Sequence, residues 1–351
     1  MSLEPRIVDA PPDEPFVGVD GHLAGARLEL SHWPGNATPR ELRHDLSTGA
    51  ALAFAALPDE RRADLVGPAR VVANNHFDTD GTLAAFAVLE PERARARARA
   101  LLAAAAAGDF FAWPDDRALC LDALVNGATD PERSPLAGEL AGLAGRARHQ
   151  RALERLLPAL PGLLDGELEP WRALWEAPLA AARADREDLA AAARDDLVHL
   201  EWTVWTAERG AVSSRADAPP RFDPGRHALW GASDADRLLV VGPGASGTTY
   251  RFLVGTRSWF DLVSRAPLPR PDLARAADAL NALEGTRAED EAAWRAQDVR
   301  GASPELWFGT TALEAFSEHS PALRASALEP ARVRRVLSDA LREGLAALLE
   351  G

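Results

Sequence analysis

The sequence predicts an α/β protein with a mainly parallel sheet flanked by helices in an N-terminal domain, followed by a smaller α+β C-terminal domain. Three observations favour this fold class. The short apolar run at residues 69–73 is typical of a buried strand. The run at residues 82–89 (TLAAFAVL) is typical of a buried helix. The chain has 351 residues, which is enough for two domains.

The domain boundary is predicted from composition. Residues 209–224 (RGAVSSRADAPPRFDP) are rich in Ser, Pro, Ala and charge, which is typical of a linker. We therefore expect an α/β domain over residues 1–210, a linker over 211–224 and a smaller α+β domain over 225–351. In the last of these, strands are expected at residues 238–241, 249–255 and 258–263, and a helix at 271–284.

Charge and composition exclude several classes of function. The net charge of −14 disfavours long nucleic acid as a partner. All 39 basic residues are arginine, so Schiff-base and P-loop lysine chemistry are excluded. No apolar run is long enough to cross a membrane and the N-terminus lacks a signal-peptide pattern, so we expect a cytoplasmic protein. The single Cys120 lies among apolar residues, which predicts a buried side chain.

The most informative motif is His76, Asp78 and Asp80, directly followed by Gly81. On an extended backbone, alternate residues share one face and lie about 6.6 Å apart. Carboxylates arranged in this way are typical of a centre that holds one or two divalent cations. We therefore predict His76, Asp78 and Asp80 as metal ligands, with Asp78 and Asp80 catalytic. The mixture of imidazole and carboxylate suits Mn²⁺, with Mg²⁺ as the alternative.

The residues after this motif are expected to bind substrate. A helix that starts near Gly81 and Thr82 would direct its free N–H groups and positive dipole end toward the metal, where a phosphate oxygen is favoured. Gly81 and Thr82 are therefore predicted substrate-binding residues. The alternative is that His76 ends a strand and that the two Asp residues are ordinary turn formers.

A fourth metal ligand is predicted at Asp109, which follows Gly108 in an expected loop. His32 and His44 are expected to have surface or capping roles, with approach to a functional site as the alternative. Other acids and histidines that remain available as ligands are Asp122, His149, Asp196 and His199.

The glycines at 242, 244 and 247 spell GxGxxG after an apolar strand. A dinucleotide-binding fingerprint requires a helix next, but the following residues 248–254 (TTYRFLV) are β-branched and aromatic. We therefore predict a glycine-rich hairpin there.

The stretch NNHFDTDGTLAAFAVL at residues 74–89 resembles the first motif of the DHH phosphoesterase superfamily. This resemblance implies that His76, Asp78 and Asp80 hold manganese. Residues 250–284 loosely resemble the substrate-binding domain of that superfamily, which implies that Arg257 contacts phosphate. The Asp-His-His triplet and the Gly-Gly-Gly-His run of the superfamily are absent. A catalytically inactive metal- or nucleotide-binding relative is therefore one alternative.

The heptapeptide FDTDGTL also resembles the signature of haloacid-dehalogenase-like phosphatases. That resemblance implies Asp78 as the nucleophile and Asp80 as the acid/base. It gives His76 no role, and the lysine usual in that family is absent.

The function that these observations predict is that of a metal-dependent phosphoesterase-like hydrolase acting on a small phosphorylated or nucleotide substrate. Mn²⁺ or Mg²⁺ at His76, Asp78 and Asp80 would activate water, and Arg257 would neutralise the phosphate. The sequence makes no prediction about oligomeric state.

Overall fold

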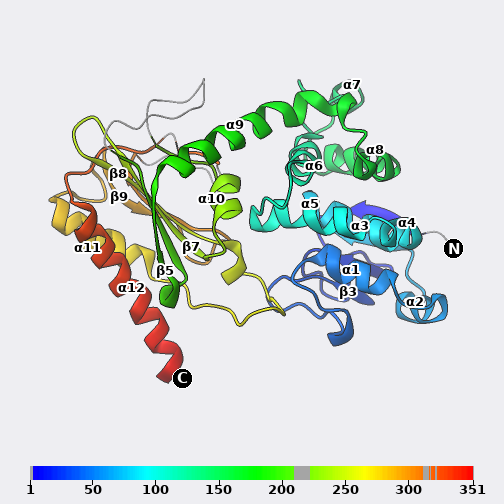
Figure 1. The fold of residues 1–351 in the computed structure, drawn as a ribbon. Coiled ribbons are helices and arrows are strands. Elements are labelled where there is room, and N and C mark those ends of the chain that lie inside the picture. Colours follow the sequence, from blue (N-terminus) through cyan, green and yellow to red (C-terminus); the bar gives the residue numbers. More distant parts are fainter. Residues whose placement is uncertain (1–2, 209–221, 311–315, 317, 321, 351) are drawn as a thin grey trace. The chain divides into compact units, whose positions relative to one another are not determined.

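The computed structural model describes residues 3–208, 222–310, 316, 318–320 and 322–350 (Figure 1). It confirms a mixed α/β protein with two sheets in the described part of the chain. The chain divides into two compact units, Met1–Leu179 with Phe260–Ala266, and Ala180–Trp259 with Pro267–Gly351. The predicted linker lies outside the described residues, apart from residues 222–224. The assignment of metal binding to residues 1–210 and of substrate binding to 225–351 stays a prediction.

The first unit contains a four-stranded sheet in which every pairing is parallel, as predicted. Its strands are β1 (Glu4–Ile7), β2 (Phe16–Val19), β3 (Leu28–Leu30) and β4 (Val71–Asn74), and their order is β1-β4-β2-β3. The three strands β2, β3 and β4 are buried along their whole length. Strands buried on both faces tend to be apolar without alternation, as β2 and β4 are, whereas β3 has Glu29 at its centre.

Helices pack around this sheet, and α1 and α3 lie side by side (Figure 1). The helical elements up to residue 191 are η1 (Arg40–Leu42), α1 (Ser47–Ala55), α2 (Asp59–Val66), α3 (Thr79–Leu89), α4 (Pro91–Arg95), α5 (Ala98–Phe110), α6 (Asp116–Gly127), α7 (Ala137–Leu140), α8 (Gly145–Asp165), η2 (Glu169–Trp171) and α9 (Arg172–Ala191). Helix α3 is buried on nearly all sides, as its small and apolar sequence predicts.

Two local predictions near the metal motif are wrong. The extended row is interrupted because β4 ends at Asn74 and Asp78 caps α3, accepting the N–H of Gly81 at 2.9 Å. Asp80 therefore lies inside the helix. Asp109 is not in a loop, because α5 continues through Gly108 to Phe110 and ends at Phe111, whose φ is +52°. A Cβ at Gly108 would lie 3.0 Å from Asp122 Oδ1, so close packing against neighbouring elements explains the glycine.

The second unit contains a six-stranded mixed sheet with the order β5-β6-β7-β8-β10-β9. Its strands are β5 (Ala193–Leu197), β6 (Trp202–Thr206), β7 (Arg237–Pro243), β8 (Thr248–Val254), β9 (Ala293–Ala296) and β10 (Glu305–Gly309). Only β6 and β7 pair in parallel among these strands. The other elements are η3 (Val198–Leu200), α10 (Arg226–Ala232), η4 (Thr256–Ser258), α11 (Leu273–Glu284) and α12 (Pro330–Glu350).

Most predicted elements of this unit are confirmed. Strands β7 and β8 form the expected glycine-rich hairpin, in which Gly244 N–H donates to Gly247 O at 2.9 Å. Helix α11 also matches the prediction, and with α12 it packs on the sheet around one apolar core (Figure 1). The strand predicted at residues 258–263 is absent, because η4 is followed there by the segment that belongs to the first unit. No described helix is long and apolar enough to cross a membrane.

Candidate metal centre

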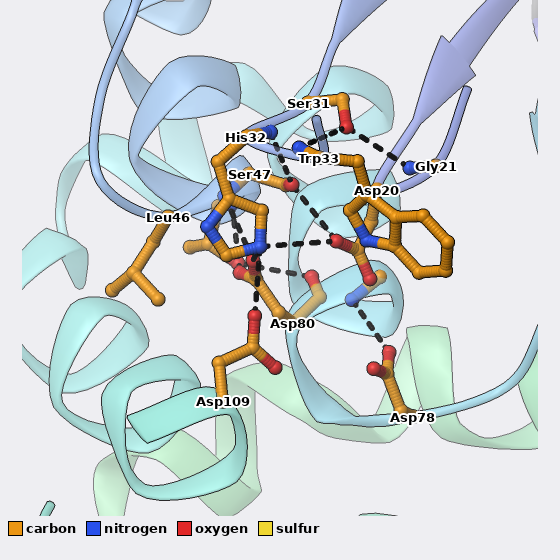
Figure 2. A network of polar contacts seen from close by, with 12 residues as sticks. Asp20, Gly21, Ser31, His32, Trp33, Leu46, Ser47, Asp78, Asp80 and Asp109 are labelled. Atoms are coloured by element: carbon orange, nitrogen blue, oxygen red, sulfur yellow. Dashed lines mark hydrogen bonds and ion pairs between the residues drawn. The ribbon is translucent and has the colours of Figure 1, made fainter. Parts of the chain in front are cut away.

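The candidate site lies where three parallel strands of the first unit end. Asp20 directly follows β2, His32 lies two residues after β3, and His76 lies two residues after β4. Parallel strands bring their carboxyl ends to the same edge of a sheet, where ligands of such folds bind. Figure 2 shows that Asp109, from α5, points toward His32 and that Asp80 lies between them and Asp20.

Four of these side chains form a set that we call the buried group: Asp20, His32, Asp80 and Asp109. Their ligand atoms all lie within 4.8 Å of one another. His32 Nε2 is 2.9 Å from Asp109 Oδ2 and 3.7 Å from a carboxylate oxygen of each of Asp20 and Asp80 (Figure 2). No side chain of the group is more than 9% exposed.

A second set, the open group, consists of Asp20, His76 and Asp78. His76 Nε2 lies 3.1 Å from Asp20 Oδ2 and 3.1 Å from Asp78 Oδ2. The side chains of His76 and Asp78 are each 30% exposed, so solvent reaches this group. The ring of Trp33 lies 5.2 Å from the His76 ring. The two groups share Asp20, whose Oδ1 is the atom nearer His32 and whose Oδ2 is the atom nearer His76.

The backbone at Asp20 is unusual, with a φ of +47°. This left-handed conformation is costly for most residues and is found preferentially at functional sites. Ser47 Oγ donates to Asp20 Oδ1 at 2.8 Å, which holds the carboxylate between the two groups. The strained backbone and this hydrogen bond together present one carboxylate to two sets of ligands.

Asp80 is held by the N-terminus of α1. The backbone N–H groups of Ser47 and Thr48 donate to its two carboxylate oxygens at 2.7 and 2.8 Å. A helix N-terminus stabilises negative charge, so these contacts favour a fixed carboxylate. A Cβ at Gly81 would lie 1.9 Å from Asn74 Nδ2 and 3.0 Å from Asp20 Oδ2, so any larger residue there would displace the Asn74 side chain.

The hydrogen bonds of His32 determine which ring nitrogen faces the carboxylates. Nδ1 lies 2.5 Å from the backbone oxygen of Asp45, and a carbonyl oxygen can only accept a hydrogen bond. Nδ1 therefore carries a proton, and Nε2 points into the buried group. At 2.9 Å from Asp109 Oδ2, Nε2 requires either a proton or a metal ion between the two atoms.

The charges of the site are incompletely balanced by its own residues. Burial, together with the charges of Asp78 and Asp80, raises the pKa of Asp20 to about 6. Burial and the charges of Asp80 and Asp20 likewise raise the pKa of Asp109 well above its ordinary value. Burial lowers the pKa of His76, but Asp78 and Asp20 outweigh it and raise this pKa to about 12. A field that holds a proton so firmly also favours a divalent cation.

The structure divides the four predicted metal ligands between the two groups. His76 and Asp78 belong to the open group, whereas Asp80 and Asp109 belong to the buried group. Gly81 donates its N–H to Asp78, and Thr82 is buried, so a role for either in binding substrate stays a prediction. Arg257 lies in η4 of the second unit, and its contact with phosphate also stays a prediction.

The other available ligands do not join either group in the part of the chain that the structure describes. Asp122 accepts a hydrogen bond from Thr79 Oγ1 at 2.6 Å. The ring of His149 stacks on Phe77. Asp196 pairs with Arg194, and His199 lies on the exposed surface of η3. Both of these belong to the second unit.

Sequence reasoning missed Asp20 and His32. The prediction that His32 has a surface or capping role is wrong, because its ring is completely buried. His44 is half-buried and its Nδ1 accepts the N–H of Leu46, but α1 has no side-chain cap hydrogen bond, so the expected role of His44 stays a prediction. The available signal was position, since Asp20 and His32 each follow a short apolar strand as His76 does.

A protein-family model, that of the family of unknown function DUF6687, matches residues 8–350, so the chain belongs to this family. Comparison with curated proteins and with solved structures gives no match. The geometry of the two groups is therefore the basis for assigning a function.

Proposed function

We propose that this protein is a metal-dependent hydrolase of phosphoester or phosphoanhydride bonds in a small phosphorylated substrate, with Mn²⁺ or Mg²⁺ as its cofactor. The observation that carries the proposal is the sharing of Asp20 between two groups of ligand-type side chains. A carboxylate that contributes one oxygen to each of two cations is suited to a two-metal hydrolytic centre, in which the ions lie about 3.5 to 4 Å apart.

The donor set supports the choice of metal. Carboxylate oxygens predominate, and each group has one imidazole. Such ligands suit Mn²⁺ and, with fewer nitrogen donors, Mg²⁺, whereas thiolates would indicate zinc or copper. The single Cys120 is buried in α6 and belongs to neither group.

The difference in exposure supports a direction of approach for substrate. The buried group is closed to solvent, whereas His76 and Asp78 are partly exposed. When bound, divalent cations polarise a phosphoryl oxygen and lower the pKa of a coordinated water. On this proposal, His76 and Asp78 face the substrate, Asp20 contributes to both groups, and His32, Asp80 and Asp109 would hold the inner cation.

The haloacid-dehalogenase-like alternative has less support. Asp78 Oδ1 accepts the N–H of Gly81, and Oδ2 contacts His76. Both oxygens of Asp80 accept backbone N–H groups, and this side chain is completely buried. Asp80 is therefore poorly placed to donate a proton to a leaving group, whereas both aspartates are suited to bind cations.

The test combines metal binding with hydrolysis. The apo protein is titrated with Mn²⁺ by calorimetry, and Mn²⁺-dependent hydrolysis of p-nitrophenyl phosphate, bis-p-nitrophenyl phosphate and nucleotides is measured. We expect two bound ions, and loss of hydrolysis in His76→Ala. His149→Ala is the matched control, because His149 lies outside both groups and should keep both properties.

The outcomes separate the alternatives. Activity that survives His76→Ala but is lost in Asp78→Asn supports an aspartyl-phosphate enzyme instead. Two bound ions without hydrolysis of any substrate support the non-catalytic metal-binding alternative. Absence of metal binding contradicts the proposal altogether.

A further inference from the structure

A seven-residue segment, Phe260–Ala266, packs within the first unit although the residues before and after it belong to the second. The chain therefore leaves the second unit after Trp259 and returns to it at Pro267. The segment forms no helix or strand. Its role must consequently be sought in the contacts that it makes in the first unit.

Hydrogen bonds attach the segment to the loop that follows β3. Asp261 N–H donates to His32 O at 2.8 Å, and Gly35 N–H donates to Asp261 Oδ2 at 3.0 Å. Asp45 Oδ1 accepts the N–H groups of Val263 and Ser264 at 2.7 and 2.9 Å. The segment is thus held at both ends of the loop that carries His32.

The first residue of the segment contacts the His32 ring directly. The Phe260 ring stacks on it, with the centroids 3.7 Å apart and the planes at 17°. Phe110, the last residue of α5, meets the edge of Phe260 with the centroids 6.0 Å apart. Phe110 follows Asp109, so one aromatic cluster contacts both His32 and the C-terminal end of α5, which carries another member of the buried group.

His32 is therefore held on several sides. Its Nδ1–H donates a hydrogen bond to Asp45 O, the Phe260 ring stacks on its ring, and the N–H of Asp261 donates to its backbone carbonyl. Nε2 is then directed at the carboxylates of the buried group. The contacts of the segment described above are with the loop that carries His32 and with Phe110, next to Asp109, so they support two members of the buried group.

We propose that Phe260–Ala266 positions His32 and thereby controls the affinity of the buried group for its cation, while the open group binds its cation independently of the segment. This inference rests on the proposed metal centre. Partners that orient a ligating histidine typically change metal affinity by about 10- to 100-fold when they are removed. Phe260 is a positioning residue on this proposal, since it acts through His32.

The experiment measures Mn²⁺ binding by calorimetry in variants that isolate each group. His76→Ala retains the ligands His32, Asp80 and Asp109, whereas His32→Ala retains His76 and Asp78. When Phe260→Ala is added to His76→Ala, we expect the affinity for the remaining Mn²⁺ ion to fall by about 10- to 100-fold. Added to His32→Ala, the same change is expected to leave the remaining affinity unaltered.

Three further variants keep the test informative. Phe260→Tyr retains the stacked ring and should restore affinity. Phe54→Ala removes another buried phenyl group, which lies in α1, and it is the control for general destabilisation. Asp45→Ala removes the carboxylate that holds Val263 and Ser264 but keeps the carbonyl that binds His32. Asp45→Ala should lower the affinity of the buried group for Mn²⁺, and it replaces Phe260→Ala as the test if that variant does not fold.

Different results would contradict the positioning role of the segment and the metal centre itself. Wild-type protein that binds no Mn²⁺ contradicts the metal centre itself. Wild-type protein that binds two ions, with Phe260→Ala weakening neither or both to the same extent, overturns the positioning role alone.

Discussion

Each unit of the molecule buries several carboxylates, but the two units balance the negative charge differently. In the second unit, Arg251 donates to Glu305 through two nitrogens at 2.7 and 2.9 Å and also pairs with Asp223 at 3.2 Å. Arg226 pairs with Glu305 as well. These four side chains are completely buried. In the first unit, the contacts of Asp20 and Asp78 with charged partners are with histidine.

The two units differ in the source of the positive charge that balances their buried carboxylates. Two guanidinium groups balance Glu305 and Asp223 at every physiological pH, so that network is complete within the chain. Burial, Asp78 and Asp80 raise the pKa of Asp20, and Asp78 and Asp20 raise that of His76. An incompletely balanced buried cluster costs stability, and such a cost is typical of a site that serves function.

The prediction with the largest effect concerns the buried network of Glu305, Arg251 and Arg226 in the second unit. Glu305→Gln leaves two buried guanidinium groups without their shared carboxylate, which should cost about 3 to 5 kcal/mol in the free energy of unfolding. Urea unfolding measures this loss, which should be the same with and without Mn²⁺. Glu4→Gln is the control, since Glu4 pairs with Arg6 on the surface and should change stability by less than about 1 kcal/mol. A small loss in Glu305→Gln would contradict the importance of this network.

The second prediction concerns metal withdrawal. A ligand that binds only the folded state at 100 times its dissociation constant stabilises it by about 2.7 kcal/mol. We therefore expect Mn²⁺ to raise the free energy of unfolding by this order, and a chelator to reverse the gain. Glu305→Gln should show the same gain, because Glu305 belongs to neither group. Equal stability with and without Mn²⁺ would contradict the inference that the cluster of the first unit is completed by a cation.

The third prediction reverses the sign of a mutational effect. Without metal, Asp20→Asn removes a charge that burial and two neighbouring carboxylates oppose, so we expect a gain of about 1 to 3 kcal/mol. Asparagine also tolerates the positive φ and can accept the Ser47 hydrogen bond. The same variant should lose the gain produced by Mn²⁺. Asp13→Asn, at an exposed acid, should change neither quantity, and a loss of apo stability in Asp20→Asn would contradict an incompletely balanced cluster.

The smallest expected effect is a pH dependence. Burial raises the pKa of Glu305, but Arg251 and Arg226 outweigh it and hold this pKa below its ordinary value. A lowered carboxyl pKa contributes stability that is present above the unfolded value of about 4.3 and is lost as the pH falls through the folded value. Wild-type stability should therefore decline more steeply than that of Glu305→Gln below about pH 4.3. Parallel curves for the two proteins would rule out this contribution.

Local pattern predicted much of the fold. The parallel sheet, the buried helix α3, the hairpin of β7 and β8 and helix α11 were recognisable because apolar period and turn residues act over a few positions. The strand expected at residues 258–263 was wrong, because contacts with distant residues of the first unit hold that segment. Such contacts leave no mark on periodicity.

The candidate site was predicted only in part. The HxDxD motif gave three residues of the two groups, but for a mistaken reason, since a helix cap replaces the extended row. Asp109 was included although its loop proved to be the end of α5. His32 was assigned to the surface because a single histidine in a sequence carries no sign of its neighbours.

The amino-acid sequence by itself determined the mixed α/β class, the exclusion of lysine-dependent chemistry and the acid-rich motif after β4, since these depend on composition and on neighbours along the chain. Only the tertiary structure decided that Asp20 joins two groups, that His32 is a member of one of them, and that Phe260 supports His32. Residues 20, 32, 80, 109 and 260 meet because strands and helices far apart in sequence end at the same place. The register of those elements is a property of the packed core, which no local pattern specifies.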